Sequence, residues 1–286
     1  MRTIETVIFP VAGLGTRMLP ATKATPKELL PVYDTPLLQF ALDEALAAGA
    51  RRIVLVSHPD KRALEDYLAP APKLESALEA KGKDALLDAV RATRLPEGVE
   101  LRIAYQPEPL GLGHAVLCGA DDALPGPVGV ILPDDLILGE PCLAEMAAAY
   151  RPGETLSLVA AQEVPAGHVD RYGIFDCDHA GEGRAIACRR FVEKPAVGTA
   201  PSRLAAVGRY ILDDSIFDIL RATGRGAGGE IQLTDAIAEM GGIHAFRFSG
   251  TRFDCGGADG LVDATLAVQQ ARRRAAETVG MGIAAA

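Results

Sequence analysis

The sequence has no tryptophan, only five cysteines and no long hydrophobic run. No window reaches the roughly 18 apolar residues that a membrane span needs, so we expect no membrane partner. No apolar stretch precedes Glu5, which argues against a signal peptide. The cysteines are Cys118, Cys142, Cys177, Cys188 and Cys255. Their odd number and the absence of a C-x-x-C pair predict reduced thiols and a cytoplasmic protein.

The chain also lacks the basic cluster that nucleic-acid binding requires. Its formal net charge is −9 at pH 7, with 38 acidic residues against 29 Lys and Arg. We therefore expect no nucleic-acid partner, and a phosphate ligand would need locally placed cations. The 286 residues are 49% hydrophobic and 23% charged, which is typical of a well-cored globular enzyme.

The common nucleotide-binding motifs are absent as well. The stretch from Val7 to Pro31 begins as an apolar strand and continues into a loop with Gly13 and Gly15. Met18 stands where a dinucleotide fingerprint needs its third glycine, and no Walker A pattern occurs. The loop nevertheless places Arg17, Lys23 and Lys27 beside glycines that let a backbone approach a ligand. We interpret it as a phosphate-binding loop.

The pattern of elements predicts an α/β fold. Residues 7–57 form a strand, the loop, a helix and a second strand, in which Thr35 is the predicted N-cap, Pro36 the first helical residue and Gly49 the C-terminal stop. Repeated β-then-α units predict a doubly wound, mostly parallel, Rossmann-like mixed sheet flanked by helices. We expect a single domain over residues 1–286.

Three segments stand apart from this alternation. Residues 59–95 carry four of the seven lysines and have no strand pattern, so a helical excursion with a solvated lysine face is expected. Residues 165–256 contain short strands in an antiparallel or mixed arrangement. A helix that begins with the segment 230–233 should end at Gly241. An Ala-rich helix is predicted over about 258–278, followed by a loose tail from Gly280.

A series of short motifs follows in one order from residue 7 to residue 256. They read GLGTRMLPATKATPKELLP, QPEPLGLGHAVLCG, LPDD, RYGIFD, FVEKP, VGRYIL, GEIQLTDAI and RFDCG. Each is weak alone, but together the series resembles the sugar-1-phosphate nucleotidyltransferases, and within them the uridylyltransferase branch. The resemblance covers nearly the whole chain.

This resemblance implies a reaction between UTP and glucose 1-phosphate that yields UDP-glucose and pyrophosphate for carbohydrate biosynthesis. Arg17 and Lys27, at the family's T-R and P-K positions, would be catalytic and neutralise the triphosphate. Lys23 either assists or is a surface lysine. Asp134 and Asp254 would hold Mg²⁺, which prefers few carboxylates together with phosphates. Asp135 is the alternative to Asp134.

The remaining implied positions bind the two substrates. Gln106 would read the uracil edge, since an amide offers one donor and one acceptor side. Glu28 distinguishes the chain from thymidylyltransferases, which carry glutamine there. The other nucleotide-binding positions are Ala12, Gly13, Gly15 and Gly111. The implied sugar-phosphate positions are Gly173, Glu193, Lys194 and Val207.

Three alternatives remain open. The same chemistry could use dTTP or another sugar 1-phosphate, or the fold could serve as a non-catalytic sugar-nucleotide sensor. His114 is more readily read as a packed or capping histidine than as a general base. No G-x-S-x-G elbow is present and Cys255 has no evident partner, so covalent catalysis finds no support. The terminal helix packs either on the core or on a second subunit, and we expect a homo-oligomer, either a dimer or a tetramer.

Overall fold

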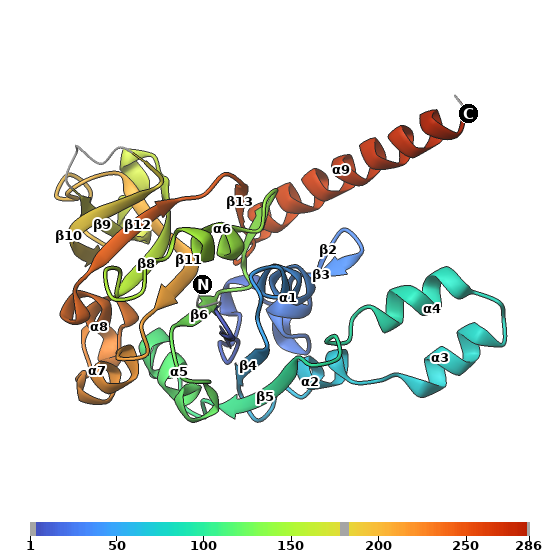
Figure 1. Cartoon of the computed structure of the whole chain (residues 1–286), viewed down its shortest axis with the longest axis horizontal. Coiled ribbons are helices and arrows are strands. Elements are labelled where there is room, and N and C mark those ends of the chain that lie inside the picture. Colours follow the sequence, from blue (N-terminus) through green and yellow to red (C-terminus); the bar gives the residue numbers. More distant parts are fainter. Residues whose placement is uncertain (1–3, 178–182, 285–286) are drawn as a thin grey trace.

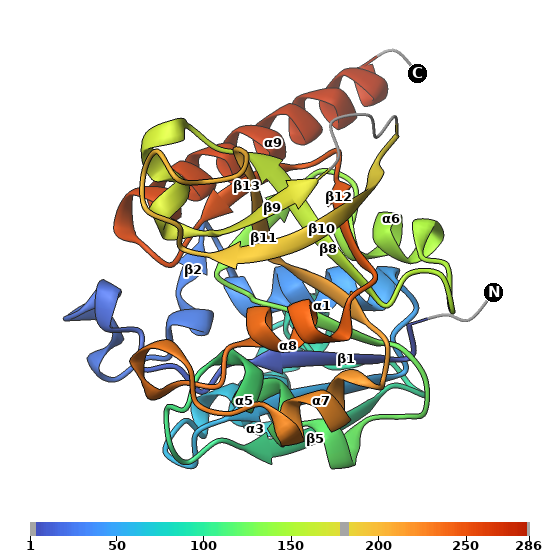
Figure 2. The same cartoon turned by 90° about the vertical axis from the view of Figure 1, so that its left-hand side faces the viewer.

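The chain is organised around a nine-stranded sheet with the order β5-β4-β1-β6-β11-β8-β12-β10-β9 (Figures 1 and 2). A computed structural model describes residues 4–177 and 183–284. The strands of this sheet are β1 (Thr6–Pro10), β4 (Arg52–Ser57), β5 (Glu100–Tyr105), β6 (Val128–Ile131), β8 (Ser157–Glu163), β9 (Gly173–Cys177), β10 (Ala185–Glu193), β11 (Leu204–Leu212) and β12 (Ile243–Arg247). Two small ribbons accompany it: β2 (Pro31–Val32) with β3 (Thr35–Pro36), and β7 (Asp135–Leu138) with β13 (Thr251–Asp254).

Most strands of the large sheet run in one direction. Strands β4 and β6 flank β1 in parallel register, β5 continues the series, and β12 is parallel to β8. Only β10 and β11, among these nine described strands, run against their neighbours. The sheet is therefore mixed but mostly parallel, and the predicted α/β architecture is confirmed.

Helices bury both faces of the sheet. Val7 and Phe9 of β1 point to one apolar cluster and Ile8 to the other, and all three side chains are fully buried. Residues of α1 (Leu37–Ala47) and α6 (Cys142–Ala149) complete the first cluster. Those of α5 (Leu112–Cys118), α7 (Ile216–Ala222) and α8 (Leu233–Met240) complete the second. A strand covered on both faces is apolar at successive positions, which explains the run Val7-Ile8-Phe9.

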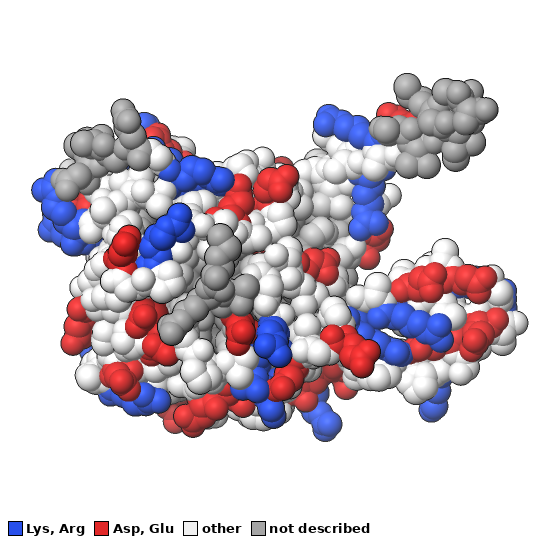
Figure 3. Space-filling view, in the orientation of Figure 1, with Lys and Arg blue, Asp and Glu red and all other residues white. Residues whose placement is uncertain are grey.

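The excursion over residues 59–95 is helical, as predicted. It contains α2 (Ala63–Leu68), α3 (Pro72–Glu79) and α4 (Asp84–Arg91), and the last two form an arm that extends away from the sheet (Figure 1). Acidic and basic side chains are interspersed over this arm on the face drawn in Figure 3. The expectation that its lysines form a solvated face is wrong for Lys61, whose side chain is 13% exposed and turns toward the loop after β1.

The terminal helix α9 (Ala258–Ala284) is longer than predicted, and the loose tail expected from Gly280 is helical as far as Ala284. The helix continues through Gly280 and Gly282 although glycine is a poor helix former, so intrinsic propensity does not account for its length. Ala264 and Val268 pack against Val32 and Leu37, so this part of the helix lies on the core. The remainder projects from the body (Figure 1).

Two helix starts differ from prediction. Helix α1 begins at Leu37 with Pro36 as its extended N-cap residue, so the assignment of Thr35 as N-cap is wrong. Thr35 instead pairs with Val32 in the ribbon of β2 and β3, which keeps both Thr35 and Pro36 extended. Helix α8 begins at Leu233 rather than at Glu230, because the preceding segment pairs with the Leu110–Gly113 loop.

The prediction of five reduced thiols is also wrong. Cys177 of β9 and Cys188 of β10 form a disulfide with an S–S distance of 2.07 Å. Their residues oppose each other across an antiparallel pair of strands, a juxtaposition that spacing in the sequence does not reveal. Cys118, Cys142 and Cys255 are free. The cysteine-based argument for a cytoplasmic location therefore does not hold for this pair.

None of the helices described within residues 4–177 and 183–284 combines the length and apolar character needed to cross a membrane.

Candidate active site

The predicted site residues follow the carboxyl ends of adjacent parallel strands. Arg17 and Lys27 lie in the loop after β1, Gln106 directly follows β5, and Asp134 lies just beyond β6. Carboxyl ends of parallel strands meet at one edge of a sheet, and ligands of open α/β sheets bind there. Loops distant in the sequence are therefore brought to one place by the strand order alone.

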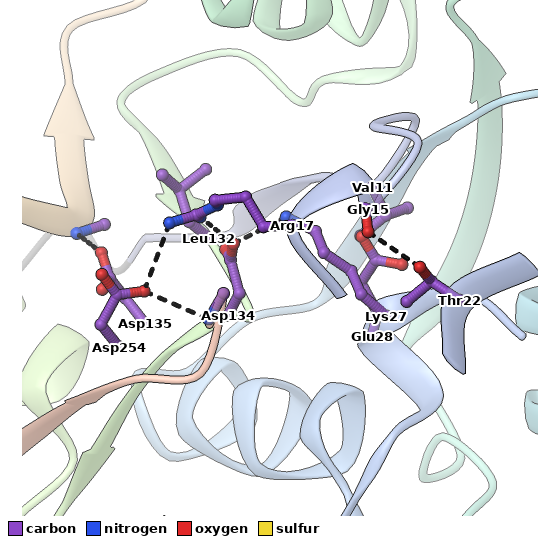
Figure 4. Close-up of polar contacts among 12 residues, drawn as sticks. Val11, Gly15, Arg17, Thr22, Lys27, Glu28, Leu132, Asp134, Asp135 and Asp254 are labelled. Atoms are coloured by element: carbon purple, nitrogen blue, oxygen red, sulfur yellow. Dashed lines mark hydrogen bonds and ion pairs between the residues drawn. The ribbon is translucent and has the colours of Figure 1, made fainter. Parts of the chain in front are cut away.

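Lys27, Arg17 and Asp134 point toward one another (Figure 4). Lys27 Nζ donates to Asp134 Oδ2 at 2.6 Å, and Arg17 Nη2 lies 3.7 Å from the same oxygen. The Lys27 and Asp134 side chains are 20% and 17% exposed, whereas that of Arg17 is 64% exposed. Lys27 is therefore fixed against a carboxylate, while Arg17 remains accessible to a ligand.

The charges of Lys27 and Asp134 stabilise each other despite their burial. Burial alone would disfavour both charged forms. The attraction and hydrogen bond between the two groups outweigh this effect, so the pKa of Asp134 lies below its usual value and that of Lys27 above its usual value. Both groups are thus charged at neutral pH, which is the state that phosphate and cation binding require.

Asp254 adds a further carboxylate to the cleft, close to Arg17. Strand β13 pairs with β7 so that Asp254 lies opposite Asp135. Arg17 Nη1 lies 4.0 Å from Asp254 Oδ1, so one guanidinium approaches both Asp254 and Asp134. A Cβ atom at residue 256 would overlap that guanidinium, so the glycine of the RFDCG motif lets Arg17 take this position.

Asp135 is engaged in structural contacts. Its Oδ1 accepts from Arg252 Nε at 2.6 Å, and its Oδ2 accepts from the backbone N–H of Gly208 at 2.8 Å. Burial raises the pKa of this carboxyl group above its usual value although Arg252 opposes the shift. Asp135 therefore ties β7 to β11 and β13, whereas the side chain of Asp134 faces the two cations of the loop.

A buried ion pair joins the loop after β1 to the helical excursion. Lys61 Nζ donates to the carbonyl oxygen of Val11 at 2.7 Å and to Glu28 Oε2 at 3.2 Å. The Glu28 side chain is 1% exposed, and its Oε1 has no hydrogen-bond partner among the described residues. Burial raises the pKa of Glu28 and lowers that of Lys61. The predicted nucleotide-binding residue Glu28 thus points inward, toward a lysine of the helical excursion.

Gln106 is only 6% exposed, so it is not a solvated residue at the end of a strand. Its Nε2 donates to the carbonyl oxygen of Gly111 at 3.0 Å and lies 3.0 Å from His114 Nδ1. The interpretation of His114 as a packed residue agrees with this contact. Gly111 has a φ of 96°, and a Cβ atom there would lie 2.7 Å from Cβ of Glu230, so only glycine fits.

A cleft of about 360 Å³ receives seven of the predicted residues. These are Arg17, Asp134, Gly173, Glu193, Lys194, Val207 and Asp254. Glu193 Oε2 accepts from Thr234 Oγ1 at 3.1 Å, and its Oε1 lies 3.3 Å from Lys194 Nζ. Lys194 has a φ of 43°, a conformation that only local constraint sustains in a residue with a side chain. The other predicted residues, including Lys27 and Gln106, are not among those lining this cleft.

Several residues of this region were not predicted. Arg252 and Thr234 hold predicted carboxylates in place, and Arg209 makes a buried ion pair with Glu44 below the cleft. Lys61 was read as a surface residue. A signal was present for Arg209, because it interrupts an apolar strand and a charge in such a position needs a partner. Arg252 lies in the short polar strand TRFD, which carries no such signal. Thr234 gave no such signal.

The carboxylates suit a divalent cation that a phosphate ligand shares. No group of three or more His, Cys, Asp or Glu within the described residues forms a complete metal site. Asp134 and Asp254 nevertheless face the same cleft and approach the same guanidinium. Mg²⁺ commonly binds one or two carboxylates and completes its coordination with phosphate and water oxygens. The donor set therefore fits a divalent cation that completes its coordination with oxygens of a ligand and of water.

Known proteins resemble the chain over most of its length. The family model described as nucleotidyl transferase matches residues 6–271. The protein named UTP–glucose-1-phosphate uridylyltransferase of Bacillus subtilis strain 168 is 44% identical over 272 residues, which cover 93% of this chain and 91% of the relative.

Solved structures give the same picture. The UTP-bound UGPase from Acinetobacter baumannii is 40% identical, with a TM-score of 0.85 over 93% of each chain. A UDP-glucose pyrophosphorylase complexed with UDP-glucose is 38% identical, with a TM-score of 0.82 over 93% of this chain and 99% of the other. By sequence and by fold, the chain belongs to the nucleotidyl transferase family.

Proposed function

We propose that this chain transfers the uridylyl group of UTP to α-D-glucose 1-phosphate, giving UDP-glucose and pyrophosphate. A phosphate oxygen of the sugar 1-phosphate forms the new bond to the α-phosphorus. The bond to the bridging oxygen of the β-phosphate breaks, and pyrophosphate leaves with that electron pair. The observation that carries this proposal is one cleft that joins Arg17, Asp134 and Asp254 to Glu193 and Lys194. Relatives named for UTP and UDP-glucose support this choice of substrates.

Arg17 and Lys27 act at the triphosphate. Phosphoryl-group transfer needs positioning and neutralisation of charge more than covalent help from the protein. Lys27 is fixed by its contact with Asp134, so its charge is in place before the substrate binds. The exposed guanidinium of Arg17 can turn from the carboxylates to phosphate oxygens. We assign the stabilisation of the leaving pyrophosphate to these two cations.

Asp134 and Asp254 would hold a divalent cation, which we propose to be Mg²⁺. When bound, it neutralises charge on the triphosphate oxygens. Asp134 is already balanced by Lys27 at 2.6 Å and Arg17 at 3.7 Å, and Asp254 by Arg17 at 4.0 Å and Arg252 at 3.8 Å. A divalent cation on these carboxylates would leave Asp134 paired when the guanidinium of Arg17 turns to phosphate oxygens.

The nucleoside binds against the loops that follow β1 and β5. Gln106 contacts the base, and the backbone of Ala12, Gly13, Gly15 and Gly111 approaches the nucleotide. A Cβ atom at Gly13 would meet no other atom within 4 Å, so the loop is open at this point. Glu28 supports this loop indirectly. It pairs with Lys61, and Lys61 donates to the carbonyl oxygen of Val11, the residue before Ala12.

The sugar phosphate occupies the other side of the cleft. Glu193 accepts hydrogen bonds from sugar hydroxyl groups, and Lys194 pairs with the phosphate. Gly173 and Val207 line the sugar through their backbones. At Gly173 a Cβ atom would collide with the ring of Phe191, and its absence leaves the backbone accessible.

Replacing Glu193 by Ala should raise KM for glucose 1-phosphate at least roughly 10-fold, because a charged hydrogen-bond acceptor is lost. KM for UTP should change little. Steady-state kinetics with each substrate varied in turn measures both values. Glu163→Ala is the matched control, since that carboxylate is exposed and is not among the residues lining the cleft. Equal increases in both KM values would contradict the assignment of Glu193 to the sugar.

Pyrophosphate release tests the proposed function directly. UTP, dTTP and GTP are each combined with glucose 1-phosphate and with galactose 1-phosphate, with Mg²⁺ and with EDTA. We expect the highest kcat/KM for UTP with glucose 1-phosphate and loss of turnover in EDTA. A higher kcat/KM for dTTP or for galactose 1-phosphate would show that this compound is the preferred substrate instead. No release with any pair would favour the sensor function.

We further propose that the chain is a cytoplasmic homo-oligomer with a single domain. The arm of α3 and α4 and the far part of α9 project on the same side of the body (Figure 1). The arm exposes the large apolar side chains Leu74 and Leu86, and the part of α9 that packs on the core exposes Val262 and Leu266 on its other side. Light scattering coupled to size-exclusion chromatography distinguishes a monomer from a dimer or tetramer.

A further inference from the structure

The amide of Gln106 is held so that only one of its atoms is free for a ligand. Its Nε2 lies 3.0 Å from the carbonyl oxygen of Gly111 and 3.0 Å from His114 Nδ1. A carbonyl oxygen can only accept, so the amide group facing Gly111 must be the NH₂ group. Its second hydrogen points to His114, whose Nδ1 must then accept. Oε1 has no partner among the described residues and is left as an acceptor.

The Gly111 carbonyl is itself fixed. Ile231 N–H donates to the Leu110 carbonyl at 2.7 Å, and Gly113 N–H donates to the Ile231 carbonyl at 2.9 Å. These two bonds clamp the loop on both sides of Gly111. The backbone of Gln106 is equally constrained, because its N–H donates to the Ser57 carbonyl at 2.9 Å and so extends the ladder of β5 with β4.

The tautomer of His114 follows from the same contacts. A neutral imidazole has one donor and one acceptor nitrogen, so acceptance at Nδ1 places the proton on Nε2. Cys118 Sγ lies 3.8 Å from Nε2, one helical turn along α5, and can accept this proton weakly. Burial raises the pKa of the Cys118 thiol, so it remains a neutral neighbour.

We infer that His114, together with the Gly111 carbonyl, locks the Gln106 amide as a pure acceptor and thereby selects a base with an N3–H over cytosine. This inference rests on the proposed function, in which Gln106 contacts the base. Uracil and thymine carry a donor at N3, whereas the N3 of cytosine is an acceptor. A freely rotating glutamine could turn its NH₂ group toward cytosine. The locked amide cannot do so without placing its Oε1 against two acceptors, the Gly111 carbonyl oxygen and His114 Nδ1.

His114 is accordingly a positioning residue that acts on specificity through Gln106. This role differs from structural support of the site, which would affect all nucleotides equally. It also makes dTTP an internal control, because thymine presents the same N3–H as uracil. The ratio of UTP to CTP should depend on His114, and the ratio of UTP to dTTP should not.

Two variants of His114 distinguish a role in base selection from structural support of the site. His114→Leu removes the acceptor at Nδ1, while His114→Asn can offer its Oδ1 in that place. We measure kcat/KM with glucose 1-phosphate for UTP, CTP and dTTP, after thermal unfolding has shown that each variant is folded. The Leu variant should lower the ratio of UTP to CTP by roughly 10-fold. The Asn variant should restore most of it, and the ratio of UTP to dTTP should stay within about 2-fold in both. If the Leu variant does not fold, His114→Phe replaces it, since a phenyl ring also lacks the acceptor.

An unchanged ratio of UTP to CTP in the Leu variant would overturn the inference, as would equal losses in the Leu and Asn variants. Both outcomes leave the proposed function standing, because the wild-type protein is active in them. A wild-type protein without activity on UTP would instead overturn the proposed function. Equilibrium dialysis of UTP and of CTP against the wild-type, Leu and Asn proteins would then test the role of His114 independently.

Discussion

Replacing Lys27 by Ala should lower kcat by about 10²–10³, while KM for UTP changes far less. A fixed cation that acts on developing charge in the transition state contributes this much in comparable sites. Lys27 meets the structural requirement for such a role, because Asp134 holds its ammonium group at 2.6 Å and its side chain is 20% exposed. Steady-state pyrophosphate release at saturating UTP and glucose 1-phosphate measures the effect.

Lys23→Ala is the matched control for this experiment. Lys23 belongs to the same loop and carries the same charge, but it is exposed and makes no ion pair among the described residues. Its variant should retain turnover within about 3-fold of wild type, because an exposed lysine contributes little. Near-normal turnover of Lys27→Ala would remove Lys27 from the catalytic set. A comparable loss in both variants would mean that the overall charge of the loop matters rather than the position of one ammonium group.

Replacing Arg209 by Met should destabilise the protein by about 3–5 kcal/mol, because it leaves Glu44 as a buried unpaired charge. Arg209 and Glu44 are 1% and 7% exposed, and Nη2 of the arginine lies 2.8 Å from Glu44 Oε2. Arg209 Nε also donates to Glu44 Oε1 at 2.9 Å, and its Nη1 donates to the Leu132 carbonyl at 3.0 Å. Urea denaturation followed by circular dichroism measures the change in the free energy of unfolding.

Two further variants test the mechanism of this destabilisation. Arg203→Met breaks a pair with Glu163 in which the side chains are 60% and 63% exposed, so it should cost less than about 1 kcal/mol. The double variant Glu44→Leu, Arg209→Met removes both buried charges and should be more stable than Arg209→Met alone. If Arg209→Met were within about 1 kcal/mol of wild type, the pair would not hold the fold together.

The Arg209 network also bears on the active site. The Leu132 carbonyl that accepts from Arg209 lies two residues before Asp134, and Gly208, beside Arg209 in β11, donates to Asp135. A single buried guanidinium therefore supports the segment that carries the acidic motif. The sequence VGRYIL was interpreted only as a strand that lines the sugar, through Val207, and its arginine received no role.

The sequence by itself determined most of the fold. Alternating apolar strands and amphipathic helices predicted a doubly wound sheet, since strands buried on both faces must be apolar throughout. The motifs then predicted the family, and the structure places them after strands β1, β5 and β6, at one edge of the sheet. The order of the predicted strands, helices and loops along the chain was sufficient for these conclusions. The direction of each strand and the position of each loop follow from local sequence patterns.

Only the tertiary structure decided which charged and sulfur-containing groups meet. Lys61 lies beneath the phosphate loop with Glu28, Arg209 reaches Glu44 across 165 positions of sequence, and Cys177 pairs with Cys188 through strand register. A lysine in a polar helical segment and a cysteine in a short strand give no local signal of their partners. Ion pairs and disulfides depend on distances of a few ångströms between side chains, and these distances arise only when the whole sheet has formed.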